Sequence, residues 1–189
     1  MQQTTANSGI WTEVTEFLKN VTLPFQYSKT FYHNNQNVNL TIDIDPGGGF
    51  ESGYEFTSLS APVAVQFTTI SSPLKESPAL LFALHDSKVM DRIGKFFGSE
   101  DVELGYPEFD KLLVVKTNNK DALHAVFADQ FVRETFRELK EFSLEIVVHE
   151  DGNPSHSLEF IIDRAITDVE ELKRIFTAFT AVLDKLTIA

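Results

Sequence analysis

The stretch NVNLTIDI at residues 37–44 alternates strictly between polar and apolar side chains. Valine, leucine and isoleucine occupy the even positions, while asparagine, threonine and aspartate occupy the odd ones. Because successive side chains of a strand point to opposite faces, this pattern predicts a strand with one buried and one solvated face. Such a strand favours antiparallel pairing, since parallel sheets are usually covered on both faces.

The residues that follow this strand predict an antiparallel meander. The sequence DPGGG at residues 45–49 has turn chemistry, and the alternation resumes at Tyr54 and Phe56 and continues through Val63, Val65 and Phe67. Before the strand, apolar residues at helical spacing from Ile10 to Val21 predict an amphipathic helix, with Ser8 as its N-cap and Pro24 beyond its end.

Beyond residue 72 the pattern changes to short strands alternating with helices. Pro73 and Pro78 bracket a predicted linker, and the apolar run at residues 79–84 predicts a strand buried on both faces. Asp86 is the expected cap of a helix that ends near Gly98. A strand at residues 112–115 precedes a helical region that changes face near Asp129, which indicates two short helices or one kinked helix.

The last third predicts a hairpin and a long helix. Alternation at residues 144–148 and 158–162, around a turn-rich segment at 150–154, is typical of a β-hairpin. Thr167 and Glu170 have capping-box spacing and open a helix with one apolar stripe. The stripe consists of Val169, Leu172, Ile175, Phe176, Phe179, Val182, Leu183 and Leu186.

Together these patterns predict an α+β fold, with a largely antiparallel sheet, helices packed on one face and the C-terminal helix closing the core. The 189 residues are expected to form a single domain, in which residues 1–8 are disordered or weakly ordered.

Composition narrows the function classes. The formal net charge of −12 disfavours binding to nucleic acid or to anionic membranes. Cysteine is absent, which excludes disulfides, thiolate metal sites and cysteine nucleophiles. The first eight residues lack the features of a targeting signal and no apolar run approaches the roughly 20 residues of a membrane span, so a cytoplasmic protein is expected.

No catalytic, cofactor-binding or metal-ligating residue is nominated. The glycines at 47, 48, 49 and 53 lack the lysine and the serine or threonine of a phosphate loop, so they predict a hairpin. No serine lies in a Gly-x-Ser-x-Gly elbow. Asp43 and Asp45 could form an acid–base pair, but solvent exposure in a strand and a turn accounts for both.

The five histidines have no metal-binding spacing. His149 and His156 are the pair that the predicted hairpin could bring together, although a solvated hairpin tip explains both. Phe25, Tyr27, Phe31 and Tyr32 lie in a stretch without a definite predicted element. We expect these aromatic residues to be buried, with a partner-binding patch as the alternative.

One segment resembles a known pattern. The residues DRIGK at 91–95, DVELG at 101–105 and EFDK at 108–111, followed by Val114 and Val115, resemble uncharacterised bacterial proteins in which a Gly-x-x-x-Phe-Asp turn precedes a strand and a helix. The resemblance covers about a third of the chain and implies a bacterial protein of unknown function. From the residues themselves, Phe109 is expected to anchor the core and Asp110 to bind backbone donors in a turn.

Two function classes follow. The first is a non-catalytic, soluble, intracellular module that binds a protein partner or associates with itself, because the chain is acidic and aromatic-rich and lacks a catalytic motif. The second is a small-molecule-binding protein or enzyme whose site is assembled from scattered residues.

Overall fold

The computed structural model describes residues 2–50, 52–64, 67–70, 75–78, 80–86, 101–149 and 155–188. The helices in this part of the chain are α1 (Gln2–Asn20), α2 (Pro107–Asp110), α3 (Lys120–Val126), α4 (Gln130–Glu138) and α5 (Val169–Ile188). The strands are β1 (Phe25–His33), β2 (Gln36–Asp45), β3 (Tyr54–Val63), β4 (Phe67–Ile70), β5 (Lys75–Pro78), β6 (Phe82–Asp86), β7 (Leu113–Thr117), β8 (Phe142–His149) and β9 (Ser155–Ile162).

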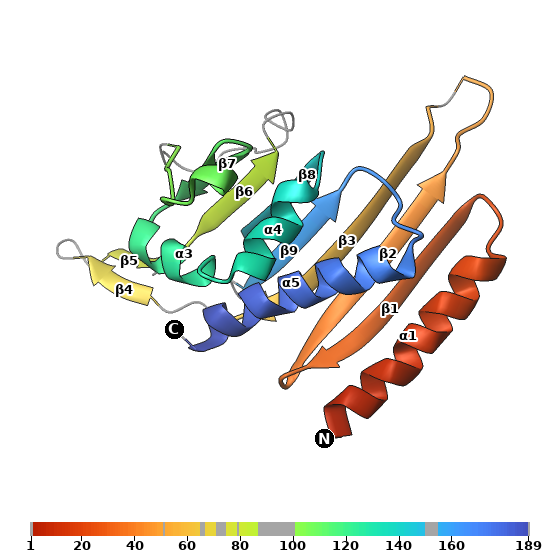
Figure 1. Cartoon of the computed structure of the whole chain (residues 1–189), viewed down its shortest axis with the longest axis horizontal. Coiled ribbons are helices and arrows are strands. Elements are labelled where there is room, and N and C mark those ends of the chain that lie inside the picture. The colour runs from red at the N-terminus through yellow and green to blue at the C-terminus, as the bar shows by residue number, and fades with distance from the viewer. Residues whose placement is uncertain are drawn as a thin grey trace.

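Seven strands form one sheet in the order β1-β2-β3-β9-β8-β6-β7, and every neighbouring pair is antiparallel. Helices α1, α4 and α5 lie on the same side of this sheet (Figure 1). The α+β class, the antiparallel sheet and the placement of helices on one face are therefore confirmed.

Strands β2 and β3 form the predicted meander, and β1 precedes them as a further strand. Phe67, which was expected to continue the meander, lies instead in β4 of a separate two-stranded sheet. The alternating stretch forms β2, in which Val38, Leu40 and Ile42 are buried as expected. Asn34 and Asn35 join β1 to β2 with φ angles of 43° and 67°. Two positive φ angles in a two-residue loop are typical of the type I′ turn, whose twist matches that of the strands. The aromatic stretch before this turn is thus strand β1.

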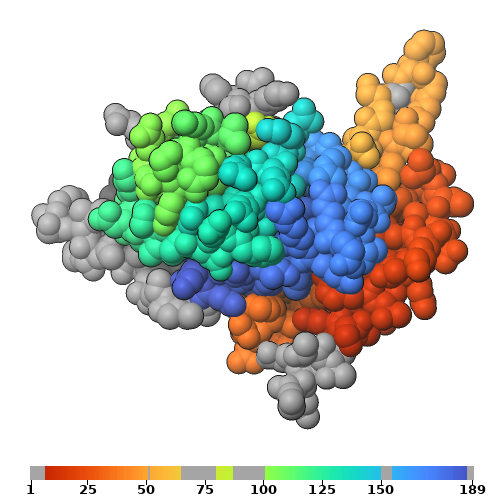
Figure 2. Space-filling view, in the orientation of Figure 1, coloured from red at the N-terminus to blue at the C-terminus, as the bar shows by residue number. Residues whose placement is uncertain are grey.

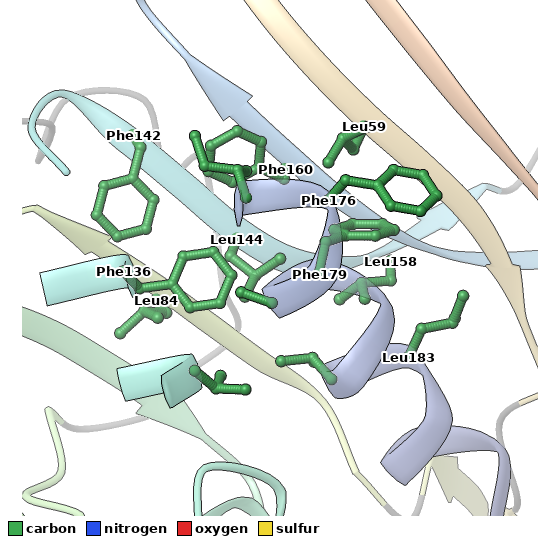
Figure 3. Close-up of a cluster of buried hydrophobic side chains, with 14 of the residues drawn as sticks. Leu59, Leu84, Phe136, Phe142, Leu144, Leu158, Phe160, Phe176, Phe179 and Leu183 are labelled. Atoms are coloured by element: carbon green, nitrogen blue, oxygen red, sulfur yellow. The ribbon is translucent and has the colours of Figure 1, made fainter. Parts of the chain in front are cut away.

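The buried side chains form one hydrophobic cluster shared by the sheet and the helices. At its centre Phe136 of α4 lies 5.9 Å from Phe142 of β8 and 6.1 Å from Phe160 of β9, measured between ring centroids. Phe179 and Leu183 of α5 are fully buried in the same cluster (Figure 3). The apolar stripe of the last helix therefore closes the core, as predicted.

Three helix starts show how capping sets the boundaries. Asn119 and Asp129 cap α3 and α4, where their side chains accept hydrogen bonds from the backbone of Ala122 and Phe131 at 3.1 and 2.8 Å. The interpretation as two short helices is confirmed. The capping box expected at Thr167 is wrong, because Asp168 caps α5 by accepting from the Glu170 and Glu171 amides at 2.8 and 3.1 Å.

Other expectations are corrected or fall outside the described residues. Helix α1 begins at Gln2, so Ser8 is not its N-cap, and the helix includes most of the stretch expected to be weakly ordered. The linker predicted between Pro73 and Pro78 is wrong for residues 75–78, which pair with β4 as strand β5. The strand expected at residues 79–84 begins only at Phe82, as β6, and all five residues of β6 are buried, as expected for a strand covered on both faces. The helix expected after Asp86 lies outside the described residues.

None of the described helices combines the length and the hydropathy that crossing a bilayer requires.

Candidate functional site

The hairpin between β2 and β3 stands out from the body of the molecule (Figures 1 and 2). Strand β2 ends at Asp45 and β3 begins at Tyr54, and these two residues are paired. The glycines are therefore followed by a strand, whereas a phosphate loop would be followed by a helix. The predicted hairpin is confirmed. Its projecting end carries Phe50, whose relative exposure of 108% is the highest among the exposed apolar residues of the described chain.

The two arms of the hairpin touch through Gly53. A Cβ atom at this position would lie 2.6 Å from the carbonyl carbon and oxygen of Pro46, closer than real Cβ contacts allow. Gly47 and Gly49 adopt φ angles of 72° and 63°, which favour glycine. Gly47, Gly49 and Gly53 therefore have specific geometric roles in the path of this loop.

A pocket of about 480 Å³ opens at the base of the hairpin. It is lined by Ile44, Asp45, Pro46, Gly53, Tyr54, Glu55 and Asp163. Three of these residues are acidic, and none of the lining residues is basic. The neighbouring Arg164 directs its guanidinium to Glu171, at 2.5 and 3.2 Å, so this cation is already paired on α5. The pocket is therefore negatively charged.

Two of the pocket carboxylates are held by backbone amides. Asp45 Oδ1 accepts a hydrogen bond from the Gly47 amide at 2.8 Å, and Glu55 Oε2 accepts one from the Ala165 amide at 3.3 Å. Each carboxylate has more acceptor capacity than one such bond uses. The arrangement can therefore accept hydrogen bonds from an ammonium or guanidinium group that enters the pocket.

Asp43 lies two residues before Asp45 on β2, and its relative exposure is only 7%. The expectation that Asp43 is exposed to solvent is therefore wrong. Gln26 of β1 donates a hydrogen bond to Asp43 Oδ2 at 2.9 Å, which helps to compensate for burial of the charge. The negative charge of Asp43 raises the pKa of the Tyr54 hydroxyl, and burial, the charge of Asp45 and a hydrogen bond to Asp43 add to this effect. Tyr54 thus stays a neutral phenol beside two carboxylates.

The histidine pair of the β8–β9 hairpin is not brought together as a metal site. Because His149 is paired with Ser155 and His156 with Val148, the two side chains point to opposite faces of the sheet. His149 is exposed, whereas His156 is buried, and its pKa is lowered by burial and by the charge of His149. Among the described residues no group of three potential ligands from histidine, aspartate and glutamate has metal-binding geometry.

His149, Ser157 and Glu159 form a hydrogen-bonded chain with the residue types of a catalytic triad. The direction of its hydrogen bonds, however, is not that of a triad. Ser157 Oγ donates its proton to Glu159 Oε1 at 2.6 Å, and His149 Nε2 lies 2.7 Å from the same Oγ. With its only hydroxyl proton committed to the carboxylate, Ser157 accepts from the imidazole. An activated serine must instead donate to histidine, so this arrangement does not prepare a nucleophile.

The remaining histidines have packing roles. His33 Nε2 lies 2.9 Å from Asp184 Oδ1 of α5, and the ring of His124 stacks on Tyr106 with centroids 4.7 Å apart. His85 is 1% exposed, and its Nδ1 lies 3.0 Å from the carbonyl oxygen of the next residue. Its Nε2 has no hydrogen-bond partner among the residues that the structure describes.

The aromatic stretch in β1 is mainly part of the interior. Phe31 is fully buried, with its ring 4.7 Å from that of Trp11 in α1. Phe25 and Tyr27 are partly buried against Phe17 of α1, with ring centroids 5.5 and 4.2 Å away. These three residues confirm the expected burial, while Tyr32 remains 46% exposed.

The Gly-x-x-x-Phe-Asp turn behaves as its residues predict. Phe109 is fully buried, and the Asp110 carboxylate accepts hydrogen bonds from the backbone amides of Leu104, Gly105 and Tyr106 at 2.9, 2.8 and 2.9 Å. Gly105 has a φ angle of 93°. The core anchor and the turn-binding carboxylate are thus confirmed as structural features of this segment.

Sequence reasoning did not identify the hairpin end and its pocket as a site. The available signal was Phe50, a large apolar side chain inside a glycine-rich turn. Asp163 gives no such signal, because only the pairing of β9 with β3 brings it near Asp45. Comparison of the chain with protein-family models, with curated proteins and with solved structures finds no match.

Proposed function

We propose that this chain is a non-catalytic intracellular module that binds a basic protein through the β2–β3 hairpin. The observation that carries the proposal is the fully exposed Phe50 at the end of a projecting hairpin whose base is an acidic pocket. Covering a side chain of this size would remove a large apolar area from water, and large aromatic residues are common anchors of protein interfaces.

Charge defines the partner. The pocket presents Asp45, Glu55 and Asp163, and the whole chain has a formal charge of −12. A basic surface is therefore attracted from a distance, which accelerates association and makes it sensitive to salt. The complementary surface is an apolar cavity for Phe50, with a lysine or arginine beside it that enters the acidic pocket.

The proposal is tested in two steps. A photo-crosslinking phenylalanine analogue replaces Phe50 in one variant and Phe131 in a matched control, since Phe131 is a 40% exposed phenylalanine on α4. The protein that is crosslinked from position 50 but not from position 131 is then purified, and its affinity for the unmodified chain is measured by calorimetry.

We expect Phe50→Ser to weaken this binding by about tenfold or more, as for an interface hot spot, and Phe131→Ser to leave it unchanged. The double variant Asp45→Asn/Glu55→Gln should reduce both the affinity and its salt dependence. Equal affinities for the Phe50→Ser and Phe131→Ser variants would refute the proposal.

A second candidate is a protein that binds a small organic cation. The supporting observation is the pocket volume of about 480 Å³, which lies in the range of small-molecule sites. Titration with spermidine and with arginine amide, monitored by the backbone resonances of Gly53 and Tyr54, tests this alternative. Saturable shifts that Asp163→Asn abolishes would support it, and unchanged resonances at millimolar ligand would reject it.

A further inference from the structure

Strand β1 forms one edge of the seven-stranded sheet, and its outward backbone groups can be identified. The side chain of Asn7 from α1 binds the backbone of Tyr32 at two points: Nδ2 donates to the Tyr32 carbonyl at 3.1 Å, and Oδ1 accepts from the Tyr32 amide at 3.4 Å. The backbone groups of Tyr32 therefore point away from β2. Because these directions alternate along an antiparallel strand, those of Gln26, Ser28 and Thr30 also point outward.

Bulges and prolines, two of the usual protections of an edge strand, are missing from this part of β1. Its pairing with β2 runs without a bulge from Phe25 to His33, and the strand contains no proline. Edge strands are commonly protected by bulges, prolines or charged side chains. Lys29, which could serve as such a charge, lies on the helix-covered face and forms an ion pair with Glu13 of α1.

The side chains of Gln26, Ser28 and Thr30 are neutral, and each contacts a side chain of the neighbouring strand β2. Gln26 binds Asp43, Ser28 lies 3.2 Å from the Thr41 hydroxyl, and Thr30 donates to Asn39 at 2.8 Å, all on β2. These contacts are made by side chains with β2, so they do not use the outward backbone groups of β1. Within the described chain, Asn7 satisfies these groups at Tyr32 only.

The opposite edge of the sheet offers a contrast. There the chain covers its own strand: the Val102 amide donates to the Val115 carbonyl of β7 at 2.9 Å, and Asp101 forms a bridge with Lys116. The fold thus protects the β7 edge with its own backbone and leaves the edge between Gln26 and Thr30 without such cover in the described residues.

We propose that the β1 edge at Gln26, Ser28 and Thr30 binds an extended, cationic segment of a partner protein by strand addition. Backbone hydrogen bonds would provide the affinity, as in other complexes formed at sheet edges. The segment is cationic rather than a second copy of this chain, because two copies would each bring a charge of −12 to the contact. This surface is separate from the hairpin and does not depend on the function proposed for it.

The experiment uses a fluorescent peptide of alternating lysine and valine as the probe, with its affinity measured by anisotropy at low salt. Ser28→Pro removes the outward amide proton, whereas the matched variant Ser28→Ala removes the same hydroxyl and keeps that proton. We expect Ser28→Ala to bind like the unmodified chain and Ser28→Pro to bind about tenfold more weakly, as for one lost hydrogen bond.

A second probe tests the proposal on the unmodified chain, so the result does not require the Ser28→Pro variant to fold. The same peptide with alternate backbone nitrogens methylated keeps its charge but cannot complete a strand ladder, so we expect it to bind the unmodified chain much more weakly. Equal binding of the two peptides would overturn the proposal, because attraction by charge alone would then explain it. Concentration-dependent dimerisation that Ser28→Pro abolishes would overturn the choice of partner. Phe50→Ser should leave peptide binding unchanged, which separates this test from that of the hairpin.

Discussion

Gly53 lies so close to Pro46 that a Cβ atom on the glycine would be 2.6 Å from the proline carbonyl oxygen. Both partners are backbone, so relief requires the arms of the hairpin to move apart. We expect Gly53→Ala to lower the free energy of unfolding by about 1–3 kcal/mol, as other overpacking changes do. Gly48→Ala is the control, because nothing lies within 4 Å of a Cβ at that position. Equal stabilities of the two variants in urea denaturation would contradict this prediction.

Asp110 accepts three backbone hydrogen bonds, and Asp110→Ala would leave all three donors without this acceptor. Loss of hydrogen bonds to a charged group should destabilise the fold by about 2–4 kcal/mol. Asp110→Asn should have a smaller effect, because it retains one acceptor oxygen. Asp101→Ala, at a side chain that is 71% exposed, is expected to change stability by less than about 0.5 kcal/mol. Thermal and chemical denaturation of the three variants give the comparison.

Phe160 is fully buried between Phe136 and Phe142, while Phe131 is 40% exposed. Phe160→Ala should therefore cost about 3–5 kcal/mol, through lost burial and the cavity left behind. Phe131→Ala makes the same chemical change at the surface and should cost less than about 0.5 kcal/mol. If the two variants have similar denaturation midpoints, the packing described for the centre of the core is wrong.

Burial raises the pKa of Glu145, and the charge of Glu159, its directly paired residue on β9, raises it further. A carboxyl group whose pKa is higher in the folded state destabilises the fold at neutral pH, and this penalty disappears as the pH falls through the folded-state pKa towards the ordinary value. We expect Glu145→Gln to stabilise the protein at pH 7 by about 0.2–1 kcal/mol, the range for cross-strand charge pairs. The gain should vanish in acid, where both forms are neutral. A pH-independent gain in denaturation experiments would argue against a charge effect.

The elements that the sequence predicts correctly are those whose pattern is complete within a few residues. Strands β2, β8 and β9 have apolar residues at every second position over most of their length, and the stripe of α5 keeps helical spacing from Val169 to Leu186. Strand β1 was missed because Lys29 occupies a position on its helix-covered face and breaks the apolar alternation of Phe25, Tyr27 and Phe31. Its charge is tolerated there because Glu13 of α1 pairs with it.

The candidate site was harder to predict than the fold because its parts come from separate segments. The pocket depends on Asp163 at the end of β9 meeting the base of the β2–β3 hairpin, a contact set by strand order. Asp43 was expected to be exposed because it lies on the polar face of its strand, but Gln26 and Tyr54 from the neighbouring strands lie against it. Cross-strand neighbours of this kind have no signature in local spacing.

The central position of β9 has a consequence for biosynthesis. Strand β9 joins β3, from the first third of the chain, to β8, so the two halves of the sheet meet along a strand that the ribosome completes only at residue 162. Until then the nascent meander has an unpaired β3 and lacks α5 over its apolar face. The two halves of the sheet therefore cannot join until β9 has been synthesised, and until then β3 has an unpaired edge of the kind that favours aggregation.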